Sequence, residues 1–121
     1  MKRSVIILDK DQDKVAGLST HIMHQGFVPI PKHSLESLQE LLESENPMAL
    51  IIDIDSFPLD TKSLRYLKRK SPDTFLLLIS ATNAHPDLKE AMEHCVYACM
   101  PKPLDLDEVD FWLKSILNDV S

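Results

Sequence analysis

Ala49-Leu50-Ile51-Ile52, followed directly by Asp53-Ile54-Asp55, is a short unbroken apolar run that ends in acids. Runs of this kind are typical of strands buried on both faces of a parallel sheet. Similar apolar runs lie at 5–8, 75–79 and 96–100. A fifth candidate, 27–30, contains Pro29, which cannot donate a ladder hydrogen bond and so favours the sheet edge. The sequence therefore predicts five short strands.

Helical patterns separate these strands. Apolar residues recur at helical spacing over 12–25, 34–44, 61–70, 86–94 and 105–120. Ser34 is expected to cap the second helix, Pro86 to open the fourth and Asp105 to cap the fifth. Leu35 and Leu106 are expected in the inward-facing stripes of their helices. This alternation predicts an α/β fold, a flavodoxin-like doubly wound parallel sheet of five strands in the order 2-1-3-4-5.

Composition indicates one small domain that spans 1–121 and excludes several functions. A chain of 121 residues is the size of a single domain. Two cysteines do not make a disulfide scaffold, so a reducing, cytoplasmic location is expected. The net charge of −6 argues against direct binding to nucleic acid, and no apolar run is long enough to span a membrane. Neither of the two glycines follows an apolar run, which excludes a glycine-rich phosphate loop.

Polar and charged residues follow the predicted strands at the points where these end. They are Asp9, Lys10, Asp11, Asp53, Asp55, Ser80 and Lys102. Because the carboxyl ends of parallel strands meet at one edge of the sheet, we expect these side chains to converge. Two carboxylates about 5 Å apart repel each other by roughly 3 kcal/mol at an effective dielectric constant near 20. Such a cluster needs a cation, a proton or a function, and Lys102 and Lys10 are the candidate cations.

This pattern resembles the receiver domains of response regulators in two-component signalling. The resemblance extends over essentially the whole chain. It rests on Val5-Ile6-Ile7-Leu8-Asp9, Leu50-Ile51-Ile52-Asp53, Leu78-Ile79-Ser80-Ala81 and Lys102-Pro103-Leu104-Asp105. It implies a phosphorelay signalling domain rather than an enzyme. Such a domain accepts a phosphoryl group from a histidine kinase or a histidine phosphotransfer protein. It then changes the surface that binds a downstream protein or output domain, and a homodimer through the last two helices is one option.

The resemblance also implies a role for each site residue. Asp53 matches the phosphoacceptor, Ser80 the hydroxyl that binds the phosphoryl group, and Lys102 the lysine that pairs with its oxygens. Asp9, Asp53 and the backbone carbonyl of Asp55 match the ligands of Mg²⁺. These roles agree with general chemistry, because phosphoryl transfer depends on positioning and charge neutralisation and Mg²⁺ prefers hard oxygen ligands.

Lys10 departs from the family pattern, which places a second metal-binding acid at this position. Three arrangements are open. Asp11 or the Asp55 carboxylate supplies the lost ligand, the Lys10 ammonium replaces the metal beside Asp9 and Asp53, or Lys10 turns to solvent and weakens the site. The second arrangement predicts weak binding of Mg²⁺. An alternative function follows, a pseudo-receiver that acts as a phosphorylation-independent protein-interaction module.

Two further features bear on binding partners. Cys99 occupies the position at which the family carries a tyrosine or phenylalanine that follows the movement of the hydroxyl. By strand alternation, Tyr97 is expected on the same face of the sheet as Cys99. The segment 62–70 carries five basic residues, which indicate either a solvated helix face or a contact for an acidic partner.

Overall fold

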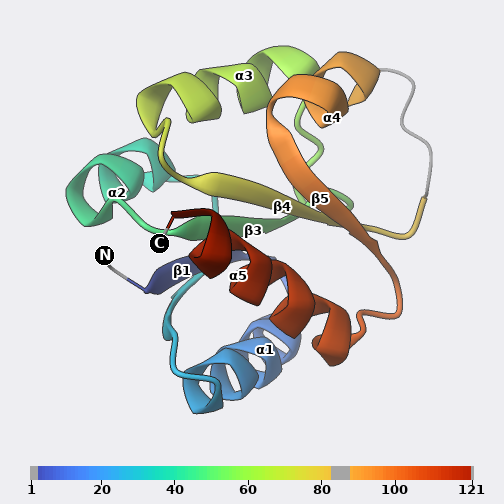
Figure 1. Ribbon diagram of the computed structural model, residues 1–121. Coiled ribbons are helices and arrows are strands. Elements are labelled where there is room, and N and C mark those ends of the chain that lie inside the picture. The colour runs from blue at the N-terminus through green and yellow to red at the C-terminus, as the bar shows by residue number, and fades with distance from the viewer. Residues whose placement is uncertain (1–2, 83–87, 121) are drawn as a thin grey trace.

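The computed structural model describes residues 3–82 and 88–120, and strands and helices alternate along them (Figure 1). The strands are β1 (Ser4–Leu8), β2 (Val28–Lys32), β3 (Ala49–Asp53), β4 (Phe75–Ser80) and β5 (Val96–Pro101). They form one parallel sheet in the order β2-β1-β3-β4-β5. The predicted fold class and strand order are confirmed, and the proline-containing strand β2 lies at an edge.

Five helices cover the two faces of this sheet. They are α1 (Gln12–His24), α2 (Leu38–Glu45), α3 (Thr61–Lys70), α4 (Lys89–His94) and α5 (Leu106–Val120). Helices α1 and α5 pack on one face, and α2, α3 and α4 pack on the other, each over its own apolar cluster (Figure 1). Among the described residues, no helix is both long and apolar enough to cross a membrane.

The predicted start of the second helix is wrong. The helix begins at Leu38, and Ser34 does not cap it. Ser37, which precedes it, has a φ of 61°, a left-handed conformation that cannot belong to a right-handed helix. This conformation leaves Leu35 outside the helix, and its side chain is 43% exposed instead of buried.

The fourth and fifth helices also differ in part from their predicted starts. The expected opening residue of the fourth helix, Pro86, lies outside the described residues, and the described helix begins at Lys89. Leu106 is exposed rather than inward-facing. It is the first residue of α5, one turn before Val109, which starts the buried stripe. Asp105 accepts a hydrogen bond from the Asp107 amide, so it does lie at the cap position.

The central strands bring the predicted site residues to one edge of the sheet. All residues of β1 and β3 are buried, and Leu8 pairs with Ile52 and Asp53 with Ile79. Asp9, which follows β1, therefore lies at the end of β3, and Asp53 lies beside the end of β4. Strand β5 forms the other sheet edge, as the predicted strand order requires, but it is mostly half-buried rather than buried on both faces.

Candidate functional site

An ion pair between Asp53 and Lys102 lies at the centre of the site. Asp53 is the last residue of β3 and is 2% exposed. The Lys102 Nζ, just beyond β5, lies 2.8 Å from Asp53 Oδ2. Asp53 Oδ1 accepts hydrogen bonds from the amides of Asp55 (2.9 Å) and Ser56 (3.2 Å). The buried carboxylate is thus held by one ammonium and two backbone donors, in a turn that follows the strand.

The Asp55 carboxylate lies in the same site and has three donors. Its Oδ2 accepts hydrogen bonds from Lys102 Nζ (2.9 Å) and the Ala81 amide (2.8 Å). Its Oδ1 accepts a hydrogen bond from Ser80 Oγ (3.3 Å). The sequence pattern assigned a role to the backbone carbonyl of Asp55, whereas these contacts involve its side chain. Ser80 is itself buried and also accepts from the Thr82 amide at 3.1 Å.

These contacts shift the ionisation of two groups. The hydrogen bonds from Lys102 and the Ala81 amide lower the pKa of Asp55 below its usual value. Partial burial works to lower the pKa of Lys102, but the hydrogen bonds to Asp53 and Asp55 outweigh it and raise that pKa. Both shifts favour the charged forms, so the site contains an ammonium shared between two carboxylates.

Asp9 is the third acid of the site and, like Asp53, it is buried. Its Oδ1 accepts hydrogen bonds from the Asp11 amide (3.0 Å) and from Ser56 Oγ (3.1 Å). Ser56, which the sequence analysis did not single out, therefore contacts Asp9 through its hydroxyl and Asp53 through its amide. No local pattern indicates this role, because the hydroxyl contact joins residues that lie 47 positions apart in the sequence. The Asp11 carboxylate caps α1 by accepting from the amides of residues 13 and 14.

Lys10 lies away from the acids that it was considered to pair with. Its side chain is exposed, and its Nζ lies 5.3 Å from the centroid of the Phe57 ring, within the range of a cation–π contact. Within residues 3–82 and 88–120, no ion pair joins Lys10 to Asp9 or Asp53. Lys10 is therefore placed as in the third of the three arrangements considered from the sequence, whereas the effect on metal binding stays a prediction.

The side chains at this edge fit a Mg²⁺ site poorly. Asp53 Oδ2 is bound by Lys102, Asp9 Oδ1 by two donors, and the Asp11 carboxylate by the start of α1. A lysine stands where the family has a second acid. In the described part of the chain, no group of three or more His, Cys, Asp or Glu side chains is placed to hold a metal ion.

A hollow of about 430 Å³ adjoins the ion pair on the α1 and α5 side of the sheet. Asp9, Asp53 and Lys102 contribute to one part of its wall, and apolar residues such as Leu18 and Leu104 to the rest. Gly17 of α1 also lines it, and a Cβ added there would meet no atom within 4 Å. The buried Asp53 carboxylate therefore borders open space rather than packed core.

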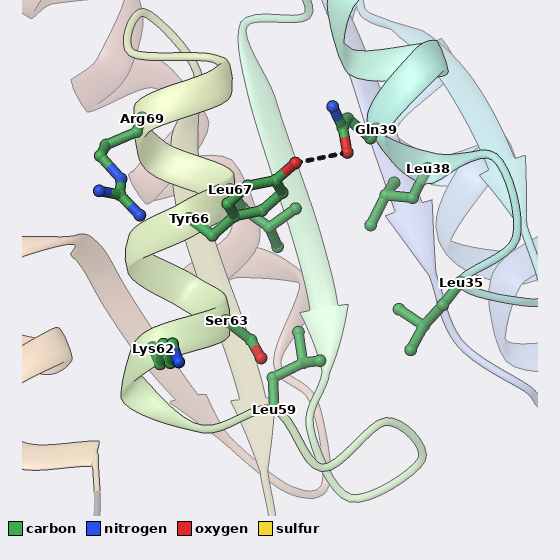
Figure 2. A pocket seen from close by; sticks show the side chains of 9 residues that line it. All are labelled: Leu35, Leu38, Gln39, Leu59, Lys62, Ser63, Tyr66, Leu67 and Arg69. Carbon is green, nitrogen blue, oxygen red and sulfur yellow. Dashed lines mark hydrogen bonds between the residues drawn. The ribbon is translucent and has the colours of Figure 1, made fainter.

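A second hollow of about 470 Å³ lies between α2 and α3, away from these acids (Figure 2). Leu38 and Leu67 form apolar walls, and a hydrogen bond of 2.7 Å from the Tyr66 hydroxyl to Gln39 spans it. Lys62 and Arg69 line it with positive charge. The other three bases of α3 have partners inside the molecule, namely Glu90 for Arg65, the Thr74 carbonyl for Lys68 and the Tyr66 ring for Lys70.

Tyr97 does not share the face of Cys99, so that expectation is wrong. Tyr97 packs with the cluster under α1 and α5, whereas Cys99 packs with the cluster under α2, α3 and α4. A shift in the pairing of β4 with β5 between Leu76 and Leu77 breaks the simple alternation. Tyr97 contacts the Trp112 ring at a centroid distance of 5.7 Å, so it connects β5 to α5 rather than to the hydroxyl of the site.

The Tyr97 hydroxyl gives a test of this placement. It donates a hydrogen bond of 2.8 Å to Asp119, which raises the pKa of the phenol above its ordinary value of 10.0. Because the folded chain holds this proton more tightly, the contribution to stability is complete below pH 10.0 and is lost as the pH rises above it. We expect Asp119→Asn to lower the pKa of Tyr97, measured by ultraviolet titration of tyrosinate with Tyr66→Phe as the background. An unchanged titration would contradict the contact.

Comparison with solved structures identifies the fold. The receiver domain of NtrC4, determined as a beryllofluoride-activated dimer, aligns with a TM-score of 0.85 and 17% identity over 98% of this chain and 99% of that one. A response regulator from Thermotoga maritima aligns with a TM-score of 0.83 and 17% identity over the same shares. A protein provisionally assigned to pilus assembly in Burkholderia thailandensis aligns with a TM-score of 0.74 and 22% identity, again over 98% and 99%.

Sequence comparison adds no closer relative. No family model matches the chain, and a search of curated proteins found no match. At these low identities, the structural likeness bears on the fold. The chain has the fold of a response-regulator receiver domain.

Proposed function

We propose that this chain is a divergent receiver domain that accepts a phosphoryl group on Asp53. The observation that supports this most strongly is the meeting of Lys102 with Asp53 at 2.8 Å, from strands that are remote in the sequence. A histidine kinase or a histidine phosphotransfer protein is the proposed donor, acting in the cytoplasm. The phosphorylated domain would then bind a downstream protein or an output domain with altered affinity.

The arrangement suits transfer of a phosphoryl group. A carboxylate oxygen of Asp53 forms a bond to phosphorus while the bond from phosphorus to the donor imidazole nitrogen breaks, and that nitrogen keeps the electron pair. Lys102 neutralises negative charge on the transferred group, and Ser80 supplies a hydrogen bond. The hollow beside Asp53 is the proposed route for the donor.

A small phosphodonor tests this proposal without knowledge of the natural kinase. The purified chain is incubated with acetyl phosphate and Mg²⁺, and its intact mass is followed with time. We expect the mass of one phosphoryl group to be added to the wild type and not to Asp53→Asn. An unmodified wild type, or an adduct that persists in Asp53→Asn, would exclude the proposal.

A phosphorylation-independent interaction module is the second candidate. Two observations favour it: Lys10 replaces an acid of the metal site, and the Asp55 carboxylate already binds Lys102 and Ser80. Such a module would bind its partner equally well with wild-type Asp53 and with Asp53→Asn. Exposed Phe111 on α5 is a candidate contact for such a partner or for a second copy of the chain.

We further propose that Mg²⁺ binds weakly, and Lys10→Asp tests this. The substitution removes a positive charge from the residue that follows Asp9 and adds a hard oxygen ligand at the position where the family carries one. We expect the affinity for Mg²⁺ to rise by about tenfold or more, since one ion pair in a partly shielded site is worth about 1.4 kcal/mol or more. Isothermal titration calorimetry with Mg²⁺ measures the change, and Lys14→Asp is the matched control. Equal affinities in wild type and Lys10→Asp would contradict this account of Lys10.

A further inference from the structure

The Asp55 side chain makes contacts that its position in the sequence does not explain. It stands in the turn after β3, two residues beyond the acceptor, yet its donors come from the ends of two other strands. Lys102 follows β5, and Ser80 and Ala81 lie at the end of β4. Both carboxylate oxygens are bonded, Oδ2 at 2.8 and 2.9 Å and Oδ1 at 3.3 Å.

These three donors form a site for an anionic group with several oxygens. An ammonium from the end of β5, and a hydroxyl and a backbone amide from the end of β4, point at one anion. Charge-assisted hydrogen bonds of this kind bind carboxylates and phosphate oxygens alike. The site therefore selects for charge and oxygen acceptors, and a carboxylate and a phosphoryl group are both suitable occupants.

The site cannot hold both occupants with the same contacts. Lys102 has three ammonium protons, and Asp53 and Asp55 already accept from the amine. The Ala81 amide has one N–H group, and its hydrogen bond is already donated to the Asp55 carboxylate. A phosphoryl group on Asp53 would carry further negative charge next to the Asp55 carboxylate, which adds repulsion to the competition for donors.

We propose that the Asp55 carboxylate is a built-in ligand of this oxyanion site and that an incoming phosphoryl group must displace it. The identification of the incoming group as a phosphoryl group rests on the proposed acceptor role of Asp53. Asp55 is thus a residue that sets the affinity of the site for phosphate and the rate at which Asp53 is modified. In the unphosphorylated chain it keeps the Ser80 hydroxyl and Lys102 bound to an anion.

Displacement predicts a gain of phosphate binding when the carboxylate is removed. The apparent affinity of a ligand falls in proportion to the fraction of molecules whose site is open. We expect inorganic phosphate to bind Asp55→Asn and Asp55→Ala at least about tenfold more tightly than the wild type. The readout is the chemical shift of the Ala81 amide in ¹H–¹⁵N spectra during titration with inorganic phosphate.

Asp60→Asn is the matched control. Asp60 lies in the same connection, caps α3 and does not contact the site, and asparagine caps helices as well as aspartate does. This variant changes the net charge equally, so it should bind phosphate as the wild type does. If it gains as much affinity as Asp55→Asn, a general charge effect explains the gain and the inference is wrong.

A second measurement separates this inference from the proposed function. The rate of phosphorylation by acetyl phosphate is compared for the same variants by intact mass. Tighter phosphate binding and roughly tenfold faster phosphorylation of the Asp55 variants would support both. If the Asp55 variants bind phosphate more tightly but neither they nor the wild type is ever phosphorylated, the result would support Asp55 as an internal ligand and exclude Asp53 as a phosphoacceptor. If the wild type and the Asp55 variants are phosphorylated at equal rates and bind phosphate equally well, Asp55 is not an internal ligand, but the acceptor role of Asp53 stands. If all of these proteins are phosphorylated, tighter phosphate binding by the Asp55 variants at an unchanged rate of phosphorylation would also overturn the inference.

Discussion

Replacing Lys102 with alanine is expected to lower the free energy of unfolding by about 3 kcal/mol, the usual cost of removing one partner of a buried ion pair. Asp53 is 2% exposed and would lose the cation that lies against it, with the Asp55 and Asp9 side chains nearby. Urea unfolding at neutral pH measures the loss. The same variant should accept a phosphoryl group more slowly, because no ammonium remains to neutralise the transferred charge.

Two comparisons isolate the ion pair from other effects of the substitution. Lys14 lines the same hollow but is exposed, so Lys14→Ala should change the stability by no more than about 0.5 kcal/mol. Adding Asp53→Asn to Lys102→Ala removes the unpaired charge, and we expect the double variant to recover part of the loss. A loss for Lys102→Ala within the range of about 0–1 kcal/mol, typical of exposed pairs, would contradict the central role of this contact.

The second large effect is expected at Leu64, where alanine should cost about 3 kcal/mol of unfolding free energy. Helix α3 is strongly basic, and its buried residues are Leu64 and Leu67. Leu64 is fully buried in the cluster that α2, α3 and α4 form against the sheet. Its truncation leaves a cavity under a helix that has few other apolar contacts.

Leu35→Ala provides the matched control for Leu64→Ala. The chemical change is the same, but Leu35 is mostly exposed at the rim of the hollow between α2 and α3 (Figure 2). We expect a loss of less than about 1 kcal/mol, because little apolar surface leaves water at this position. Similar losses in the two variants, measured by urea unfolding, would show that α3 is not anchored as described.

The strands and the meeting of the site residues could be predicted because each depends on short-range patterns. Unbroken apolar runs indicated the buried strands, and Pro29 indicated the edge. Since parallel strands present their carboxyl ends at one edge, strand order made Lys10 and Lys102 the candidate cations, and the family resemblance favoured Lys102. The structure places Lys102 in contact with Asp53.

The remaining features depend on tertiary contacts or on backbone details that no local pattern encodes. Leu35 lies outside α2 because Ser37 has a positive φ. Tyr97 changes face because the pairing of β4 and β5 shifts by one residue. The direction of the Asp55 carboxylate depends on donors that lie at least 25 residues away. A hydrogen bond of 2.9 Å between His21 of α1 and Asp110 of α5 likewise requires the two helices to be packed.

The chemical identity of the modified residue tests the central claim most directly. The chain is treated with acetyl phosphate, reduced with borohydride, which converts a phosphorylated aspartate to homoserine, and digested for peptide sequencing by mass spectrometry. We predict homoserine at position 53 and at no other acid of the site. Homoserine at Asp9, Asp11 or Asp55 in place of Asp53, or no homoserine at all, would contradict the account.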